Sequence, residues 1–436
     1  MLQKTAYKFR AYPDGEQASL LRRTAGCCRL VYNLCLEQRR LEWHRSAPRR
    51  INAASQMKEL KGLKAAAPFL RQVPHHPLQQ AIRDLDRAFQ NFFEGRAAYP
   101  KPRTKFRHTS FRYPDPLQIK VDREAQRIFL PKAGWVRLRI HREIVGEVKN
   151  VTVSEAGGWW FVSIAVEQTI DAPMLKVGST VGIDLGVVNA IATSGGDVFD
   201  LPRVSPREQQ QLAAVQKTIA RRRQGSRNRL KAILRLRRLQ ARHARRRADA
   251  KHKATSCLAR DHALIVMEDL KVRNMTASAR GTVEEPGSMV AQKAGLNRSL
   301  LDMAPGETRR QIEYKVSQAG GQLIVVPPQY TSQQCSSCGW TAQENRSTRD
   351  RFSCVFCGFT ACADVNAALN ILAKGLTTLG GTGGHPGMAC GSSPLKGRGC
   401  VRTFSAWTPR ARRLVRERTS GSCSDGPEDR SHAHNS

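Results

Sequence analysis

CSSC occupies residues 335–338 of this chain. It is followed closely by CVFC at 354–357 and by ADVNAALN at 363–370. Two CxxC pairs separated by fifteen residues have a spacing that suits four thiolates around tetrahedral zinc. Glycine follows each pair, at Gly339 and Gly358, and glycine allows the tight turn that directs backbone amides toward sulfur. The stretch predicts a zinc ribbon. Its expected ligands are Cys335, Cys338, Cys354 and Cys357.

The same spacing leaves two alternatives, a pair of disulfides or a redox-active CxxC. The chain begins MLQKTAYKFR, without an apolar signal segment, so we expect a reducing compartment in which disulfides do not persist. Four protein ligands leave no open coordination position for a substrate. Zinc is therefore expected to be structural, stabilising a segment too small to have its own core.

Three carboxylates define a second candidate site. Asp364 follows the cysteine pairs, Asp184 lies in VGIDLG at 181–186, and Glu268 lies in IVMEDL at 265–270. The last two are at or near the ends of apolar runs that read as buried strands. Carboxylates are hard ligands for Mg²⁺ or Mn²⁺, and a pair of such ions about 4 Å apart can hydrolyse a phosphodiester. We predict that all three acids are catalytic and that Asp184 faces both ions.

Each acid also has an ordinary interpretation. Asp364 could simply cap the helix that begins beside it, and Asp269 could take the place of Glu268 as a ligand. The residues alone leave these alternatives open.

The charge of the chain indicates its partner. A formal net charge of +36 on 436 residues, with a sequence pI near 10.6, exceeds what solubility requires and favours a polyanion. No apolar stretch approaches the roughly 20 residues that span a bilayer. Nucleic acid is the expected partner, and a membrane is not.

The periodicity of the sequence changes along the chain. Residues 11–104 show helical spacing, with Leu78, Ile82, Leu85 and Phe89 at three- and four-residue steps, and predict a helical lobe. Residues 1–10 and 105–172 show period-two runs and a turn at 157–158, and predict a small antiparallel β-barrel or sandwich into which that lobe is inserted. In KPRTKFRHTSFRYP, at 101–114, basic residues alternate with aromatic ones, a composition that binds phosphates and stacks on bases.

The rest of the chain divides into an α/β core and a tail. Strands ending near Asp184, Glu268 and Pro327, with helices between them, predict a nuclease domain at 178–326 and 362–375, interrupted by the ribbon at 327–361. Residues 376–436 are rich in Gly, Ser, Pro and Arg and predict a disordered basic tail.

Several ordered motifs together resemble the TnpB (OrfB) family of insertion-sequence proteins. They are KFRAYP at 8–13, FRYP at 111–114, LPKAGWVRLR at 130–139, VGIDLG, IVMEDL, GLNRSLLD at 295–302, TSQQCSSCG at 331–339 and DVNAALNI at 364–371. The resemblance implies an RNA-guided DNA endonuclease related to type V CRISPR effectors. It implies a RuvC-like, RNase H-type core with a zinc ribbon insertion, and a β-barrel (wedge) domain containing a helical recognition lobe. The family's catalytic acids carry over to Asp184, Glu268 and Asp364.

Two departures from the family pattern are local. Cys362 stands where the family often has a second acid, and MAPGE at 303–307 replaces a helix start that usually carries tryptophan. The first should leave metal binding intact, whereas the second makes packing near Pro305 and Gly306 hard to predict.

On this resemblance, residues 205–255 are a basic helical hairpin beside the nuclease that holds a guide RNA and its heteroduplex with DNA through the phosphate backbone. The expected partners are a guide RNA and target double-stranded DNA, with one chain for each RNA and a dimer left open. The candidate nucleic-acid contacts are Arg112, Tyr113, Arg221, Arg222, Arg223, Arg227, Arg235, Arg238, Arg245 and Arg246.

Two other functions remain compatible with the sequence. A transposase that joins transposon ends would use the same kind of core, and a non-catalytic zinc-ribbon protein would need only the charge and the cysteines. For any of the three we expect a cytoplasmic, nucleoid-associated protein of a prokaryote.

Overall fold

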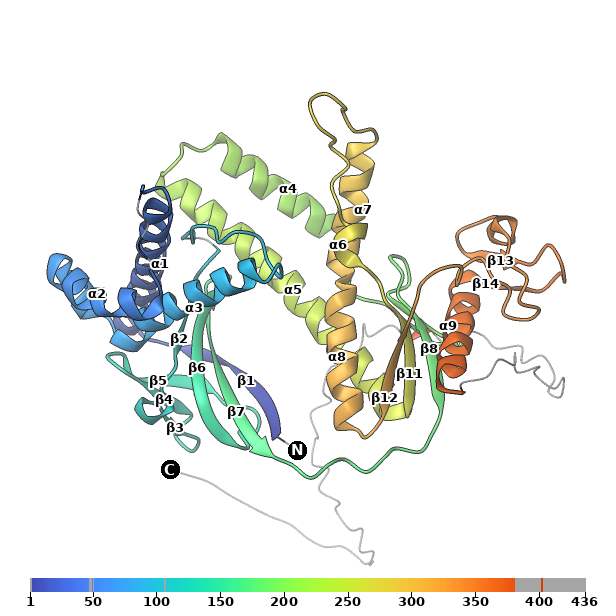
Figure 1. The fold of residues 1–436 in the computed structure, drawn as a ribbon, viewed down its shortest axis with the longest axis horizontal. Coiled ribbons are helices and arrows are strands. Elements are labelled where there is room, and N and C mark those ends of the chain that lie inside the picture. The colour runs from blue at the N-terminus through green and yellow to red at the C-terminus, as the bar shows by residue number, and fades with distance from the viewer. Residues whose placement is uncertain (1, 47–48, 50, 106, 381–400, 403–436) are drawn as a thin grey trace, which may run out of the picture.

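The computed structural model describes residues 2–46, 49, 51–105, 107–380 and 401–402. They form two sheet-based units, one with the amino-terminal helices and one with the carboxy-terminal acids, connected by a long helix (Figure 1). Among the described helices, none is long and apolar enough to cross a bilayer. Phe106 of the basic-aromatic segment lies outside the described residues.

The first unit contains a seven-stranded antiparallel sheet. Its order is β2-β6-β7-β1-β5-β4-β3, so the amino-terminal strand pairs with β5 and β7 across the helical insertion, as the sequence predicts. In the described residues no pairing joins β2 to β3, so the strands form one open sheet where the sequence analysis expects a small barrel or sandwich. The strands are β1 (Leu2–Tyr12), β2 (Ser110–Tyr113), β3 (Lys120–Asp122), β4 (Arg127–Leu130), β5 (Gly134–Arg139), β6 (Glu147–Ala156) and β7 (Trp159–Thr169).

The helical lobe shares one core with this sheet, because the alternating buried residues of the strands pack against the apolar faces of α1 and α3. Asp14 caps α1, and Gln17 completes the capping box while also donating to the backbone carbonyls of Ala133 and Trp135 beside β5. The helix is thereby fixed to the sheet at its first turn. The lobe comprises α1 (Gly15–Trp43), α2 (Ala53–Ala66), η1 (Pro68–Gln72) and α3 (His75–Phe93), and η2 (Pro116–Gln118) follows β2.

The second unit is built on a mixed sheet of order β12-β11-β8-β9-β10-β15. β8, β11 and β12 are parallel, while β9 is antiparallel to both its neighbours. The central strands are buried along nearly their whole length, which explains their uninterrupted apolar sequences. The bounds are β8 (Thr180–Asp184), β9 (Ile191–Thr193), β10 (Val198–Phe199), β11 (Leu264–Glu268), β12 (Gln322–Val326) and β15 (Val401–Arg402).

Helices cover both faces of this sheet. The second half of α5 packs with α8 on one face, and α9 packs on the other (Figure 1). The helices are α4 (Pro206–Arg221), α5 (Arg227–Asp261), α6 (Val272–Met275), α7 (Val290–Met303), α8 (Pro305–Gln318) and α9 (Ala363–Gly380).

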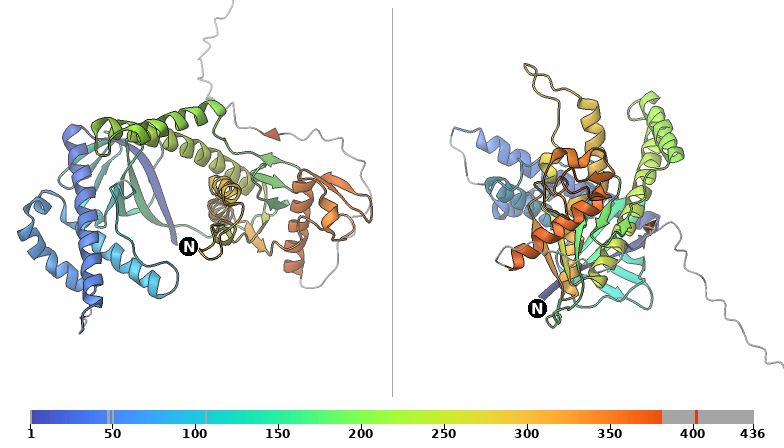
Figure 2. Two further views of the ribbon diagram at one scale, coloured as in Figure 1. Left: turned by 90° about the horizontal axis from the view of Figure 1, so that it is seen from above. Right: turned by 90° about the vertical axis from the view of Figure 1, so that its right-hand side faces the viewer.

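The predicted basic hairpin is α4 and α5, and α5 connects the two units (Figure 2). Its buried residues are confined to positions from His243 onward, so its first half is exposed. The β6–β7 turn contacts this half, because a Cβ on Gly157 would lie 2.7 Å from the Cβ of Ala241. Gly157 and Gly158 both have positive φ, as expected for the predicted turn.

The α7–α8 junction shows how the MAPGE segment is accommodated. Ala304 has a left-handed backbone, and Pro305 begins α8. The buried Lys251 of α5 donates to the carbonyls of Met303 and Ala304, at 2.8 and 3.2 Å. The bond to Met303 satisfies a carbonyl at the end of α7, whereas the carbonyl of Ala304 also accepts from the backbone amides of Glu307 and Thr308 in α8.

The carboxy-terminal boundaries differ from prediction. α9 continues to Gly380, so residues 376–380 of the predicted disordered tail are helical, and Val401–Arg402 pairs with β10. The remainder of the predicted tail lies outside the described residues. The ribbon contains η3 (Gln343–Arg346), β13 (Arg351–Ser353) and β14 (Thr360–Cys362).

Candidate catalytic site and metal centre

Two of the predicted acids lie at the same edge of the second sheet. Asp184 is the last residue of β8, and Glu268 is the last residue of β11. The strands are parallel and adjacent, with Ile183 opposite Met267, so both chains leave the sheet side by side. The carboxyl ends of parallel strands are where α/β proteins usually place their functional groups.

The third acid reaches this edge on α9. A Cβ on Gly182 would lie 2.0 Å from the carbonyl oxygen of Ala368, and one on Gly375 would lie 2.4 Å from Val266. Only glycine at these two positions lets the helix lie directly on β8 and β11. Asp364, in the first turn of that helix, is thereby brought toward Asp184.

The pKa of Asp184 responds to the charges of the other two acids. Burial raises the pKa of its carboxyl group to about 7, and the negative charges of Glu268 and Asp364 act in the same direction. The Arg346 guanidinium opposes them. Burial also raises the pKa of Glu268, against the hydrogen bond from Thr331 and the charge of Lys374.

Two side chains contact the carboxylate of Asp364. Asn189 donates to Asp364 Oδ2 at 2.9 Å, and Arg346 Nη2 lies 3.9 Å from Asp364 Oδ1. Among the described residues, the side-chain hydrogen bond of Asp364 is this one from Asn189 rather than one from its own helix. Helix capping, the alternative reading of Asp364, is therefore not what this structure shows.

Asp269 is engaged elsewhere. It forms ion pairs with Lys271 and with Arg309, the latter at 2.7 Å, and its hydrogen bonds with these two side chains hold its pKa below the usual range. The alternative in which Asp269 replaces Glu268 beside Asp184 finds no support in these contacts.

The four cysteines form a compact cluster in which every sulfur lies within 4.8 Å of the others. Cys335 and Cys357 have Sγ atoms 3.7 Å apart, as do Cys338 and Cys354. A tetrahedron with zinc–sulfur bonds of about 2.3 Å has edges of about 3.8 Å. The cluster therefore suits zinc. Gly339 and Gly358 have positive φ in the two turns, as the sequence analysis expects.

The acids are spread more widely than the thiols. Within the described part of the chain, the four cysteines place their ligand atoms close enough together to hold one ion, and the three acids form no such compact group. Two ions about 4 Å apart need ligands distributed around both of them. The mutual repulsion expressed in the pKa of Asp184 shows that bound cations would relieve an existing electrostatic cost.

A hydrogen-bonded chain connects the ribbon to the acids, and sequence reasoning missed it. The hydroxyl of the buried Thr331 donates to Glu268 Oε1. Asn370 of α9 donates to the carbonyl of Thr331 at 2.9 Å, and Asn366 holds Ser336 and Gln334 in the first cysteine turn. The available signal was the pair of asparagines in DVNAALN, which are too polar for an ordinary buried helix face.

The predicted nucleic-acid residues fall into three groups. Arg246 donates to Glu208 at 2.8 Å and so helps to hold α4 against α5. Tyr113 is a core residue, only 1% exposed, so its ring is not available to stack on a base. The others lie exposed on β2 or the hairpin: Arg112, Arg221, Arg222, Arg223, Arg227, Arg235, Arg238 and Arg245.

The ribbon carries an exposed aromatic pair. Trp340 and Phe356 stack with centroids 5.2 Å apart and an interplanar angle of 22°. Both rings remain largely exposed although they lie beside the cysteine turns. Such a pair offers a flat apolar surface of the kind on which bases stack.

Three protein families match parts of the chain. Residues 306–371 match a Cas12f1-like TNB domain, residues 163–279 match the OrfB_IS605 family described as "Probable transposase", and residues 1–47 match a helix-turn-helix domain. In the structure, the segment that matches the helix-turn-helix domain contains β1 followed by one long helix, α1.

Curated relatives match over most of the chain. "Putative RNA-guided DNA endonuclease InsQ" of Escherichia coli (strain K12) is 43% identical over 401 residues, covering 91% of this chain and 96% of the relative. A "Putative RNA-guided DNA endonuclease" of Streptomyces pristinaespiralis is 36% identical over 381 residues, covering 86% and 90%.

One solved structure that aligns is a "Cryo-EM structure of the Cas12f1-sgRNA-target DNA complex". It has a TM-score of 0.45 and 14% sequence identity, and the alignment covers 85% of this chain and 98% of that one.

Proposed function

This chain belongs to the TnpB (OrfB) family of insertion-sequence proteins, and from that premise we propose that it is an RNA-guided DNA endonuclease. The proposed enzyme uses a guide RNA derived from the end of its element and cleaves target DNA beside a short flanking motif. Base pairing with the guide would select the sequence, while the protein reads the flanking motif and the backbone.

The observation that carries the proposal is the convergence of three acids from distant parts of the chain. Asp184, Glu268 and Asp364 are brought to one edge by two parallel strands and the helix that crosses them. Among the described strands of the second sheet, the order β15-β10-β9-β8-β11-β12, with β9 antiparallel to both its neighbours, supports a RuvC-like, RNase H-type core. A protein that only binds nucleic acid has no need to gather like charges in a partly buried site.

The three carboxylates are proposed to hold the divalent ions, Mg²⁺ or Mn²⁺. When bound, these ions activate water and neutralise the phosphate. The protein's own part is to keep the ligands oriented: Thr331 fixes the Glu268 carboxylate, and Asn189 fixes that of Asp364. Because the pKa of Asp184 is about 7, its proton is readily released near neutral pH when a cation arrives.

Arg346 is, with Lys374, a cation already present beside the acids. It extends from the ribbon toward Asp364 and lowers the pKa of Asp184. A guanidinium in this position can also bind a phosphate oxygen. We propose that it contacts the DNA backbone at the cleavage site, with zinc on the four cysteines keeping its segment folded.

The proposed nucleic-acid path includes the exposed arginines of α4 and α5. Among the described residues, the exposed first half of α5 has little apolar burial, so its like charges repel one another unless phosphates are present. This favours a helix that lies along a nucleic acid in the assembled enzyme. Such a ribonucleoprotein would act at the nucleoid of the cytoplasm.

The test is to express the chain with its native flanking DNA, purify it and sequence the RNA that copurifies. One discrete RNA, reading from the element end into a variable 3′ segment, supports guiding and defines a substrate. Magnesium-dependent cleavage of DNA complementary to that segment would then be expected.

Heterogeneous RNA without guided cleavage would overturn the proposal. Strand-transfer products joined to transposon ends would instead identify a transposase. Unchanged biological function after Asp184→Ala would identify a non-catalytic binding protein, since either enzyme would lose turnover while keeping its affinity for nucleic acid.

A further inference from the structure

The helical lobe contains a cavity that the proposed reaction does not use. It has a volume of about 700 Å³ and lies between the end of α1, the end of α3 and the residues Arg49, Ile51 and Tyr99. This volume is typical of small-molecule sites. Its lining includes Trp43, Phe92, Phe93 and Tyr99, together with Arg40 and Arg49.

The aromatic rings of this cavity are unusually open to solvent. Trp43 is 77% exposed, Phe93 is 74% exposed and Tyr99 is 44% exposed. Phe92 contacts both Phe93 and Tyr99, with centroid distances of 5.4 Å, so these three rings form a connected wall. Trp43 has no ring contact within the described residues and is free to cover a ligand. Exposed apolar clusters of this kind mark binding sites.

The charges around the cavity indicate an anionic ligand. Its carboxylate Glu42 is already paired with Arg45 at 3.2 Å, and nearby Glu94 is paired with Arg96. Arg39 is held by Asp86 at 2.9 Å. In the described part of the chain, Arg40 has neither an ion pair nor a hydrogen bond, so its guanidinium is available to a phosphate.

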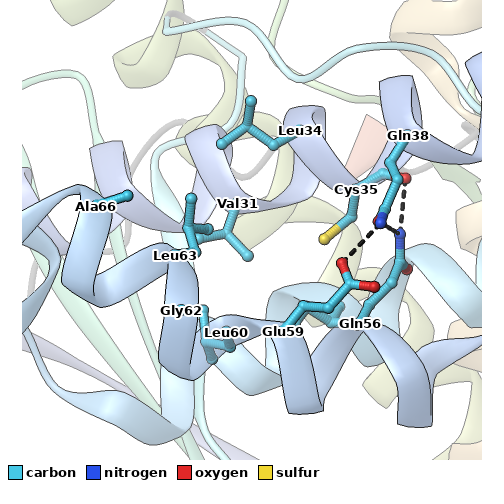
Figure 3. Close-up of a pocket in the computed structure, with 11 residues that line it drawn as sticks. Val31, Leu34, Cys35, Gln38, Gln56, Glu59, Leu60, Gly62, Leu63 and Ala66 are labelled. Carbon is cyan, nitrogen blue, oxygen red and sulfur yellow. Dashed lines mark hydrogen bonds between the residues drawn. The ribbon is translucent and has the colours of Figure 1, made fainter.

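A neighbouring hollow provides a contrast within the same lobe. The groove between α1 and α2 is lined by aliphatic side chains such as Val31, Leu34 and Leu63, and its polar end is closed by a hydrogen bond from Gln38 to Glu59 at 2.6 Å (Figure 3). It contains no aromatic ring and no cation among its lining residues. Its chemistry suits neither a base nor a phosphate.

We propose that the cavity at Trp43, Phe93 and Tyr99 binds an unpaired nucleobase of single-stranded nucleic acid, with Arg40 on the adjacent phosphate. Flat rings accept any base by stacking, and the cation fixes the backbone beside it. The site lies on the lobe rather than at the acids. The proposed function bears only on which nucleic-acid strand enters this site, because the bases and phosphates that the site recognises are common to RNA and DNA.

The experiment uses the full-length, zinc-loaded chain and photocrosslinking. Two twelve-nucleotide probes carry one halogenated base, one as 5-iodouridine in oligouridine and one as 5-iododeoxyuridine in oligothymidine. Crosslinked peptides are identified by mass spectrometry, so the many other basic surfaces do not obscure the result. We expect crosslinks in the peptides that contain Trp43, Phe93 or Tyr99. The stronger probe identifies whether RNA or DNA is the ligand.

Matched variants make the result specific. Trp43→Ala should lower crosslinking in the cavity about tenfold, whereas Trp43→Phe should retain most of it, because stacking needs a ring rather than an indole. Phe93→Ala provides a second, equally exposed truncation. Phe69→Ala is the control, since Phe69 is an exposed aromatic of the same lobe outside the cavity and its loss should change nothing.

Three results would overturn the proposal. The first is crosslinking confined to other peptides, and the second is an equal loss in Phe69→Ala. The third is a Trp43→Ala variant that changes the oligomeric state in sedimentation without changing crosslinking, which would make the cavity a contact between copies of the chain. Because none of these measurements requires cleavage, they remain informative if the proposed endonuclease activity fails its own test.

Discussion

The two candidate metal sites obtain their ligands in opposite ways. The four cysteines lie within residues 335–357, and two short turns bring them together. The three acids come from residues 184, 268 and 364, and only the finished sheet with α9 across it makes them neighbours. A local site can be inferred from spacing, whereas a distant one depends on packing, so errors in packing should damage the acids before the cysteines.

The largest effect should come from the acid at the centre of that packing. We expect Asp184→Asn to lower the rate of guided cleavage by about three orders of magnitude, because the variant removes the proposed metal ligand whose pKa both other acids raise. Cleavage of a labelled DNA target measures the rate, and gel-shift assays should show unchanged binding. The control Asp269→Asn should cleave within a few-fold of the wild-type rate. Equal losses in the two variants would show that Asp269 is a ligand in place of Glu268.

The local site should respond with loss of its metal. Cys335→Ser should reduce bound zinc from about one ion per chain to almost none and expose the ribbon to protease, because three thiolates hold zinc poorly. Elemental analysis and limited proteolysis measure the two effects. Cys362→Ser is the control, since this exposed thiol of β14 lies outside the cluster. Zinc loss in the control would mean that the ligand set is wrong.

The packing itself can be tested at Gly182. Alanine there would place a Cβ 2.0 Å from the carbonyl oxygen of Ala368, so α9 must move away from β8. We expect a loss of about 3 kcal/mol in unfolding free energy and weaker cleavage, with zinc retained. Urea denaturation measures the stability. At Gly195 the nearest atom would be 3.8 Å from an added Cβ, so Gly195→Ala should change stability by less than about 0.5 kcal/mol.

A smaller effect should show that the two sites communicate. Thr331→Ala removes the hydroxyl that holds Glu268, so we expect about tenfold weaker Mn²⁺ binding at the acids. Manganese titration followed by electron paramagnetic resonance measures this without relying on cleavage. Thr331→Ser should restore affinity, since it keeps the hydroxyl. If serine and alanine behave alike, Thr331 acts through packing and not through its hydrogen bond.

The last prediction is a pH dependence of stability without added magnesium. Asp184 binds its proton more tightly when folded, with a pKa of about 7, than when unfolded, where about 3.9 is usual. The stabilisation of the folded state that this bound proton provides is therefore present at pH 4 and is lost as pH rises through 7. The melting temperature should fall less between pH 5 and pH 8 in Asp184→Asn than in wild type. A wild-type slope unchanged by this substitution would contradict the prediction.

Sequence reasoning succeeded where the structure is local or periodic. Apolar runs located β8 and β11, the CxxC spacing located the ribbon, and alternation located β6 and β7 with their turn. It failed at Tyr113, where an aromatic in a basic segment proved to be core, because alternation alone does not say which face of β2 is buried. It also missed Thr331, whose role depends on a neighbour far away in the sequence.

The sequence by itself predicted a polyanion partner, four cysteines with zinc-binding spacing and three candidate acids, because charge, spacing and strand ends are properties of short segments. Tertiary structure decided that the charge of Asp364 raises the pKa of Asp184, that Asp269 pairs with Arg309, and that Trp43 and Tyr99 line one cavity. Each of these outcomes depends on how closely two distant backbones approach. That distance is set by packing against glycines such as Gly182, and no local pattern encodes it.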